Sequence, residues 1–142
     1  MKFSYALALA GSLAFVACGG DDDSNPASAK SDCSVTGGVK VVSPAAGETY
    51  KVNDVITIVY GSDVDGSGYR FEYWASEDAE VVYLFDGSEG LDGQGDGKTC
   101  YEVKAKLDAD RGVVASSKAF IRVAPYERSS KRGDSGKFTV KE

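Results

Sequence analysis

Short stretches in which apolar and polar residues alternate recur along the chain from residue 38 onward. In the stretch 54–60, Ile56, Ile58 and Tyr60 occupy every second position. A period of two residues is typical of a β-strand with one buried face. Glycine, aspartate, serine and proline separate the stretches, as expected for turns. The pattern predicts strands at 38–43, 54–60, 69–75, 80–86, 99–107, 118–124 and 136–140.

These strands predict an all-β fold, an immunoglobulin-like β-sandwich of about seven strands. The expected domain, residues 37–142, is long enough for one core and too short for two. In the stretch 69–75, Tyr69, Phe71 and Tyr73 share one face, while Trp74 lies on the other with polar neighbours. The side chains expected in the core are Ile56, Ile58, Tyr60, Phe71, Tyr73, Val82, Leu84, Ile121, Val123, Phe138 and Val140.

Residues 1–17 have the layout of an export signal, with Lys2 before the apolar run 5–17. The run is shorter than the roughly 20 apolar residues of a membrane-spanning helix. The Phe-Val-Ala-Cys sequence at 15–18 resembles the lipobox of bacterial lipoproteins. The resemblance implies cleavage before Cys18 and lipidation of its thiol with palmitate-type acyl chains, which makes Cys18 a membrane anchor. The alternative is an ordinary signal peptide that leaves Cys18 as a free thiol.

A polar segment, 18–36, follows the expected anchor and contains hardly an apolar side chain. Such a composition predicts a flexible acidic tether, because the segment cannot bury enough surface to fold. Asp21, Asp22 and Asp23 resemble the acidic signals that send lipoproteins of the Bacteroidetes type to the cell surface; a solubilising linker is the alternative. We therefore expect a lipid-anchored protein of the bacterial outer membrane, on its periplasmic or surface-exposed face.

The two remaining cysteines, Cys33 and Cys100, form a candidate disulfide. A bridge that closes so long a loop stabilises a fold by about 4 kcal/mol on the chain-entropy model. Disulfides persist in oxidising compartments, which agrees with export.

The composition excludes several classes of function. The net charge of −6 provides no basic face for nucleic acid. The chain has no histidine, the commonest general base and zinc ligand. Carboxylate pairs of the glycosidase type are conceivable among residues such as Asp63 and Glu72, but an acidic chain supplies such pairs by chance. We therefore expect no enzymatic activity and no catalytic residues.

The segment Val39–Ser62 resembles the opening of the Knh-like domain of Ser/Thr-rich cell-wall proteins. The shared features are an apolar strand, Ser43-Pro44, a turn at Gly47, an aromatic at Tyr50 and a second alternating strand. Asn53 and Asp54 stand where that family usually has glycine before the second strand, and Tyr60 stands where it usually has tryptophan. The resemblance implies an immunoglobulin-like fold and an envelope or cell-wall role without catalytic residues.

Two glycine-rich acidic loops, 61–68 and 85–98, could supply oxygen ligands to calcium. From Asp92 the second loop follows part of the EF-hand pattern, but its closing acid, Glu102, comes one position early and no helices flank it. A polar hairpin loop is the alternative. No other cofactor and no metal-binding residue is predicted.

Exposed aromatic side chains provide a candidate ligand surface. Trp74 on a polar face suits stacking on sugar rings, with Tyr69, Phe120 or Tyr126 as further contacts. The alternative places Trp74 in the core, as in many immunoglobulin-like domains. We predict a lipid-anchored, non-catalytic structural or interaction module whose partners are the membrane, envelope proteins or cell-wall and matrix polysaccharide. The alternative function is a surface carbohydrate-binding module.

Overall fold

A computed structural model describes residues 32–64, 68–87 and 95–142, and Asp32–Glu142 forms one compact unit with its own core. The predicted signal peptide, Cys18 and most of the tether lie outside the described residues. So do Asp92 and Gln94 of the expected calcium loop. No helix in the described part of the chain is long and apolar enough to cross a lipid bilayer.

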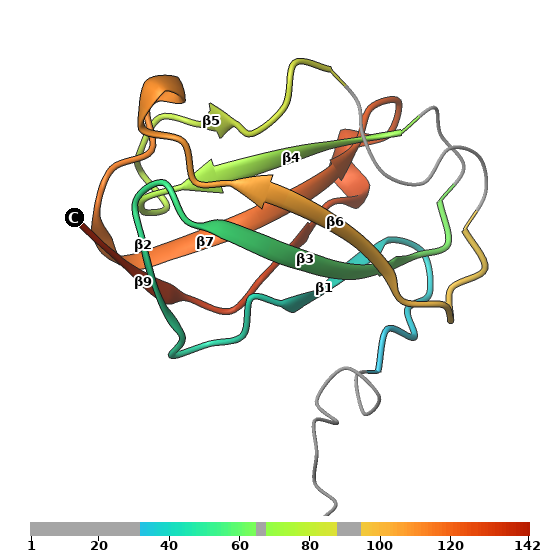
Figure 1. The fold of residues 1–142 in the computed structure, drawn as a ribbon. Coiled ribbons are helices and arrows are strands. Elements are labelled where there is room, and N and C mark those ends of the chain that lie inside the picture. The colour runs from blue at the N-terminus through green and yellow to red at the C-terminus, as the bar shows by residue number, and fades with distance from the viewer. Residues whose placement is uncertain (1–31, 65–67, 88–94) are drawn as a thin grey trace, which may run out of the picture. The chain divides into compact units, whose positions relative to one another are not determined.

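The described residues fold into two packed β-sheets (Figure 1). One sheet has the order β1-β3-β6, and the other has the order β2-β9-β7-β4-β5, with β8 also paired to β7. Neighbouring strands are antiparallel except β2 and β9, which run parallel from Thr49↔Thr139 to Lys51↔Lys141. This arrangement confirms the predicted all-β, immunoglobulin-like sandwich. The strands are β1 (Val39–Ser43), β2 (Thr49–Lys51), β3 (Val55–Ser62), β4 (Tyr69–Trp74), β5 (Val82–Tyr83), β6 (Tyr101–Lys106), β7 (Ser116–Pro125), β8 (Gly133–Asp134) and β9 (Phe138–Lys141).

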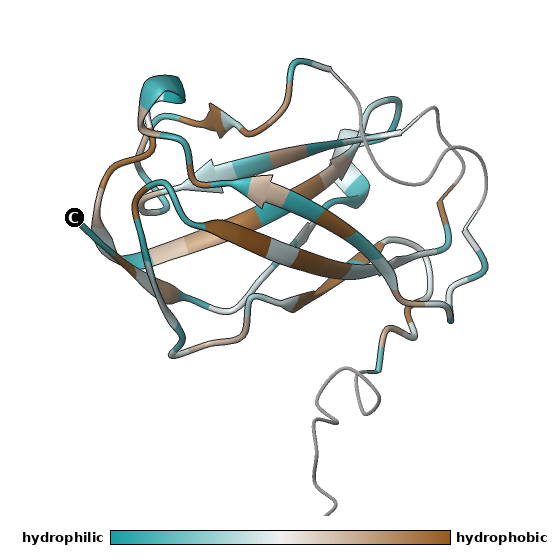
Figure 2. Ribbon diagram, viewed as in Figure 1, coloured by the Kyte–Doolittle hydropathy of each residue, from teal (hydrophilic) through white to brown (hydrophobic). Residues whose placement is uncertain are grey.

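The core forms from the alternating residues of both sheets. Figure 2 shows the apolar residues along β3 and β7. At its centre the ring of Tyr60 contacts those of Tyr69 and Phe71, with centroids 5.5 Å apart in each pair. All the expected core side chains are buried except Val82, which is half-buried and packs against the edge of the core.

The turns before and after β2 each contain a residue with a positive φ angle. Gly47 has a φ of 87°, which glycine adopts without steric cost, so the predicted turn is present. Asn53 has a φ of 76°, and asparagine is among the few other residues that tolerate this left-handed region. Its side-chain oxygen also accepts a hydrogen bond from the backbone N–H of Ala109 at 3.0 Å. Asparagine can therefore replace glycine before the second strand.

The strand prediction differs from the structure in three places. The expected strand 80–86 is reduced to the two residues of β5, beyond which one more hydrogen bond, from the N–H of Leu84 to the carbonyl of Phe71 at 2.9 Å, links the chain to β4. Two short strands, β2 and β8, were not predicted from the sequence. β2 pairs with β9, which is distant in the sequence, and β8 pairs briefly with β7. A run of two or three residues is too short for alternation to indicate such strands.

The predicted bridge between Cys33 and Cys100 is present, with the two Cα atoms 5.3 Å apart. It holds the first described residues of the domain against the start of β6. The carboxylate of Asp63 accepts hydrogen bonds from the backbone N–H groups of Gly37 and Gly38, at 2.6 and 2.8 Å. These bonds lower the pKa of Asp63. The bridge and these hydrogen bonds fix the segment 33–38 to the sandwich, so residues 33–36, which were expected in the tether, belong to the compact unit.

Candidate functional site

Trp74 lies on the outer face of the sheet, at the end of β4. It is directly opposite Phe120 of β7, and the two rings are nearly parallel, with centroids 6.0 Å apart. The guanidinium carbon of Arg122 lies 4.7 Å from the centre of the indole ring. Trp74 is half-buried. The predicted outward orientation of Trp74 is therefore present, but other side chains already contact its ring.

The polar edge of Trp74 is also occupied. The indole N–H donates to one carboxylate oxygen of Glu72 at 3.0 Å, and the Nε of Arg70 donates to the other at 3.1 Å. Glu72 is only 4% exposed, so both hydrogen bonds stabilise a buried carboxylate. Binding of a ligand by Trp74 stays a prediction.

The other aromatic residues predicted to contact a ligand differ in how far they are exposed. Tyr69 is fully buried, and its hydroxyl bonds to the Ser62 hydroxyl at 2.6 Å and donates to the Val64 carbonyl at 3.2 Å. Its predicted role as a ligand contact is thus corrected to a core role, because β4 turns this side chain inward. Phe120 is 2% exposed and is likewise inaccessible. Tyr126, at 39% exposure, remains available.

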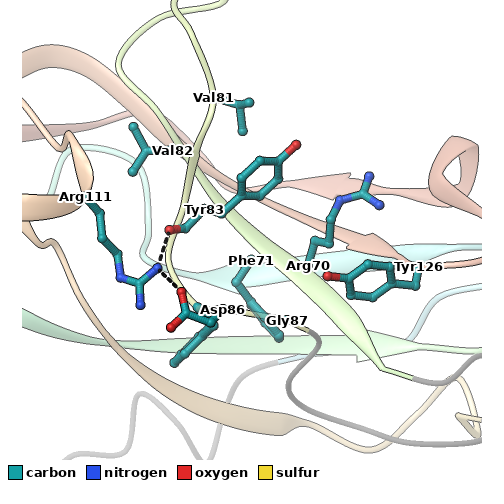
Figure 3. A pocket seen from close by; sticks show the side chains of 10 residues that line it. Arg70, Phe71, Val81, Val82, Tyr83, Asp86, Gly87, Arg111 and Tyr126 are labelled. Atoms are coloured by element: carbon teal, nitrogen blue, oxygen red, sulfur yellow. Dashed lines mark hydrogen bonds and ion pairs between the residues drawn. The ribbon is translucent and has the colours of Figure 1, made fainter.

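A second region of the same sheet has the form of a binding site. A cleft of about 560 Å³ lies beside β5, within the range of small-molecule sites in proteins. Four separate segments line it: β4, the segment 81–87, the turn after β6 and Tyr126, which follows β7 (Figure 3). The full lining comprises Arg70, Phe71, Val81, Val82, Tyr83, Phe85, Asp86, Gly87, Arg111 and Tyr126.

Local sequence explains how Arg111 reaches this cleft. Ala109–Arg111 form a 3-10 turn, η4, between β6 and β7. The side chain of Asp108 caps its start by accepting from the backbone N–H of Asp110, and Gly112 ends it with a φ of 112°. Aspartate before such a turn and glycine after it are the residues that these positions favour. The turn carries Arg111 across to β5.

The charged groups of the cleft are only partly paired with each other. Nη1 of Arg111 lies 3.1 Å from the carboxylate of Asp86 and donates to the carbonyl of Tyr83 at 3.4 Å. The guanidinium carbon of Arg70 lies 5.3 Å from the centre of the Tyr126 ring. Figure 3 shows Arg111 with Asp86 and, separately, Arg70 with Tyr126. The cleft thus combines two guanidinium groups with tyrosine rings.

A smaller hollow of about 240 Å³ adjoins this cleft and shares Val81, Val82 and Arg111 with it. Val114, which is 55% exposed, lies along this hollow. The two hollows therefore meet at β5 and the η4 turn.

The expected calcium loops supply no metal centre in the part of the chain that the structure describes: no cluster of three or more histidine, cysteine, aspartate or glutamate side chains able to hold an ion occurs there. The carboxylate of Asp96 accepts bonds from the backbone N–H groups of Lys98 and Thr99, at 2.8 and 2.7 Å. It therefore closes a local turn, whereas Asp63 joins two distant segments.

The cleft was not predicted from the sequence, because its residues come from segments that appear unrelated in the linear chain. One signal was available: Tyr83 lies within an expected strand but on the face opposite Val82 and Leu84, and it is 48% exposed. The sequence Asp-Ala-Asp-Arg-Gly at 108–112 was a second, as a capped turn that contains an arginine.

No protein-family model and no curated protein matches the chain. Among solved structures, it is similar to the fibronectin(III)-like modules of Clostridium thermocellum CbhA, with 16% sequence identity and a TM-score of 0.34. That match covers 72% of this chain and 91% of the module. The assignment to immunoglobulin-like sandwiches rests on the sheet order and strand register described above.

Proposed function

We propose that this chain is a lipid-anchored protein of a bacterial envelope, whose immunoglobulin-like domain is a non-catalytic structural or interaction module. The observation that carries the proposal is the Cys33–Cys100 disulfide. The chain has three cysteines, so Cys18 has no cysteine left to pair with in its own chain. Lipidation accounts for a cysteine placed directly after the apolar run 5–17.

Metabolic labelling tests the anchor. The full chain and its Cys18→Ser variant are expressed in a Gram-negative host that is fed an alkyne-tagged palmitate. We expect the unchanged chain to carry the label and to be found in the membrane fraction. We expect the variant to carry no label. An unlabelled chain, or equal labelling of both proteins, would refute the anchor.

We also propose that the anchored protein resides in the outer membrane. Support comes from the acidic run Asp21–Asp23 close behind Cys18. Protease treatment of intact cells distinguishes the two faces of that membrane, because only a surface-exposed domain is degraded. Replacement of all three aspartates by alanine should protect the domain if the run is a surface signal, and should change nothing if it is only a linker.

An interaction role is favoured over catalysis by the chemistry available. The chain lacks histidine, and several of its described carboxylates, among them Asp63, Asp96 and Glu72, accept structural hydrogen bonds or form ion pairs. The Knh-like resemblance points the same way, towards envelope proteins or cell-wall polysaccharide as partners.

Carbohydrate binding is the second candidate, favoured by the half-buried Trp74 on the outer face of the sheet. Trp74 is the sole tryptophan of the chain, so its fluorescence reports on this site alone. Iodide quenching that plant or bacterial polysaccharides suppress would support contact at Trp74. An emission that is neither quenched by iodide nor altered by any polysaccharide would exclude it.

A further inference from the structure

We propose that the cleft beside β5 binds an acidic saccharide, with the carboxylate of a uronic acid unit held by Arg70 and Arg111 and sugar rings placed against Tyr83 and Tyr126. The inference names the partner of the interaction module proposed above and rests on that proposal. It concerns a different surface from Trp74.

Unused hydrogen-bond donors are the first support. Arg70 binds Glu72 through Nε, and within the described residues its two terminal nitrogens have no hydrogen-bond partner. Arg111 uses Nη1, while its Nε and Nη2 have no partner in that same part of the chain. A guanidinium group binds a carboxylate best when two neighbouring N–H groups point at its two oxygens. Both arginines retain such a pair of nitrogens.

The balance of charge is the second support. The lining of the cleft contains two arginines and a single carboxylate, that of Asp86. The side chain of Asp86 is 91% exposed, so its ion pair with Arg111 is weak and easily exchanged for another anion. The chain as a whole carries a net charge of −6. Glu72, just outside the lining, balances the charge of Arg70. An anionic ligand is therefore favoured by the weak, exchangeable pair between Arg111 and Asp86 and not by a net positive charge.

Exposed aromatic rings narrow the class of anion. Tyr83 and Tyr126 are 48% and 39% exposed, and both line the cleft. An aromatic ring presents an apolar face to the C–H groups of a sugar while its hydroxyl bonds to water or ligand. Tyr126 also lies against Arg70, which restrains that guanidinium. Phosphate or a simple carboxylate would leave these rings unused.

The edge of β5 argues against an extended peptide as the ligand. A peptide that adds to a sheet needs the free carbonyl and N–H groups of the edge strand. β5 has only two residues, and the carbonyl of Tyr83 already accepts from Arg111. A ligand bound by side chains, as sugars are, has no such requirement. The adjoining smaller hollow gives room for a further sugar unit.

Calorimetric titration with a defined galacturonate tetramer tests the site. The protein used is residues 19–142, which retains the compact unit Asp32–Glu142 and its disulfide. We expect the acidic tetramer to bind and the neutral galactose tetramer not to bind. Arg111→Gln should weaken binding about tenfold or more, because hydrogen bonds to charged groups are strong. Tyr126→Ala should weaken it as well.

Arg128→Gln is the matched control, because it removes the same charge from an exposed position outside the cleft. It should bind the tetramer as the unchanged protein does, and unchanged thermal unfolding would exclude loss of fold in every variant. The proposal is overturned by no binding, by equal affinity for the neutral tetramer, or by equal losses in Arg111→Gln and Arg128→Gln. Equal affinity for a polyglutamate peptide would reveal an anion site without sugar specificity and overturn it too. None of these outcomes alters the labelling of Cys18, so the anchor is judged separately.

Discussion

Gly61 allows the N-terminal segment to lie against β3. A Cβ atom at Gly61 would lie 2.0 Å from the carbonyl oxygen of Cys33, which is backbone and cannot move aside alone. We expect Gly61→Ala to lower the free energy of unfolding by about 1–3 kcal/mol. Urea unfolding measures this, with Gly38→Ala as the control because its nearest atom would be 3.4 Å away. Equal effects of the two substitutions would contradict the packing argument.

The carboxylate of Asp96 gives the domain a defined response to acid. The Thr99 hydroxyl donates to it, the backbone N–H groups of Thr99 and Lys98 also donate, and together they lower the pKa of Asp96 from 3.8 to about 2. Because the pKa is lower in the folded state, the stabilisation is complete above about pH 4 and is lost as the pH falls towards 2.

Asp96→Asn should therefore reduce the change in urea midpoint between pH 5 and pH 2. Asp78→Asn, which removes another exposed carboxyl group, is the control for net charge. If both variants keep the full acid response of the unchanged domain, the turn at Asp96 is not its source.

At the scale of the strands, alternation predicted most of the fold because buried and exposed faces impose a period of two on the sequence. The first half of β3 follows this period, since Ile56 and Ile58 are buried and Val55 is exposed, whereas residues 59–62 are all buried. The ends were less predictable: β7 begins at Ser116, two residues before the expected start. Pairing with a neighbouring strand extends it there, and the local sequence does not contain that information.

The cleft could not be predicted for a related reason. Alternation assigns a side chain to a face, but it does not say which segments meet across that face. Arg111 reaches β5 only because the η4 turn crosses between the sheets, and Tyr126 lies near Arg70 because Tyr69 pairs with Pro125. The sequence predicted exposed aromatic residues, and the structure was needed to place tyrosines beside arginines.

On the outer face of β4 and β7, the side chain of Arg122 covers the ring of Trp74. Arg122 binds the Asp134 carboxylate with two nitrogens, at 2.7 and 3.0 Å, while covering Trp74. We expect Arg122→Gln to cost about 1 kcal/mol of stability, since ion pairs and cation–π contacts at partly exposed sites are each modest. It should also make Trp74 fluorescence easier to quench with iodide. Unchanged quenching would mean that Arg122 does not shield the ring.

For the molecule as a whole, the disulfide makes the stability of the domain depend on the redox conditions around it. The sandwich has one core layer, and the first described segment contributes Cys33 but little other apolar surface. The bridge joins residues 67 positions apart, so it restricts a large part of the unfolded chain. The full stability of this domain therefore requires an oxidising environment, which export provides and a reducing cytosol does not.

The Cys33→Ser/Cys100→Ser double variant should accordingly lose about 4 kcal/mol of unfolding free energy on the chain-entropy model. Urea unfolding followed by Trp74 fluorescence measures the loss, and the unchanged protein under reducing conditions should lose a similar amount. Cys18→Ser is the control, because Cys18 takes no part in the bridge. A loss below about 1 kcal/mol would mean that the segment 33–38 is held by Asp63 and its neighbours alone. A loss as large as expected would instead make the bridge a main source of the stability of the domain.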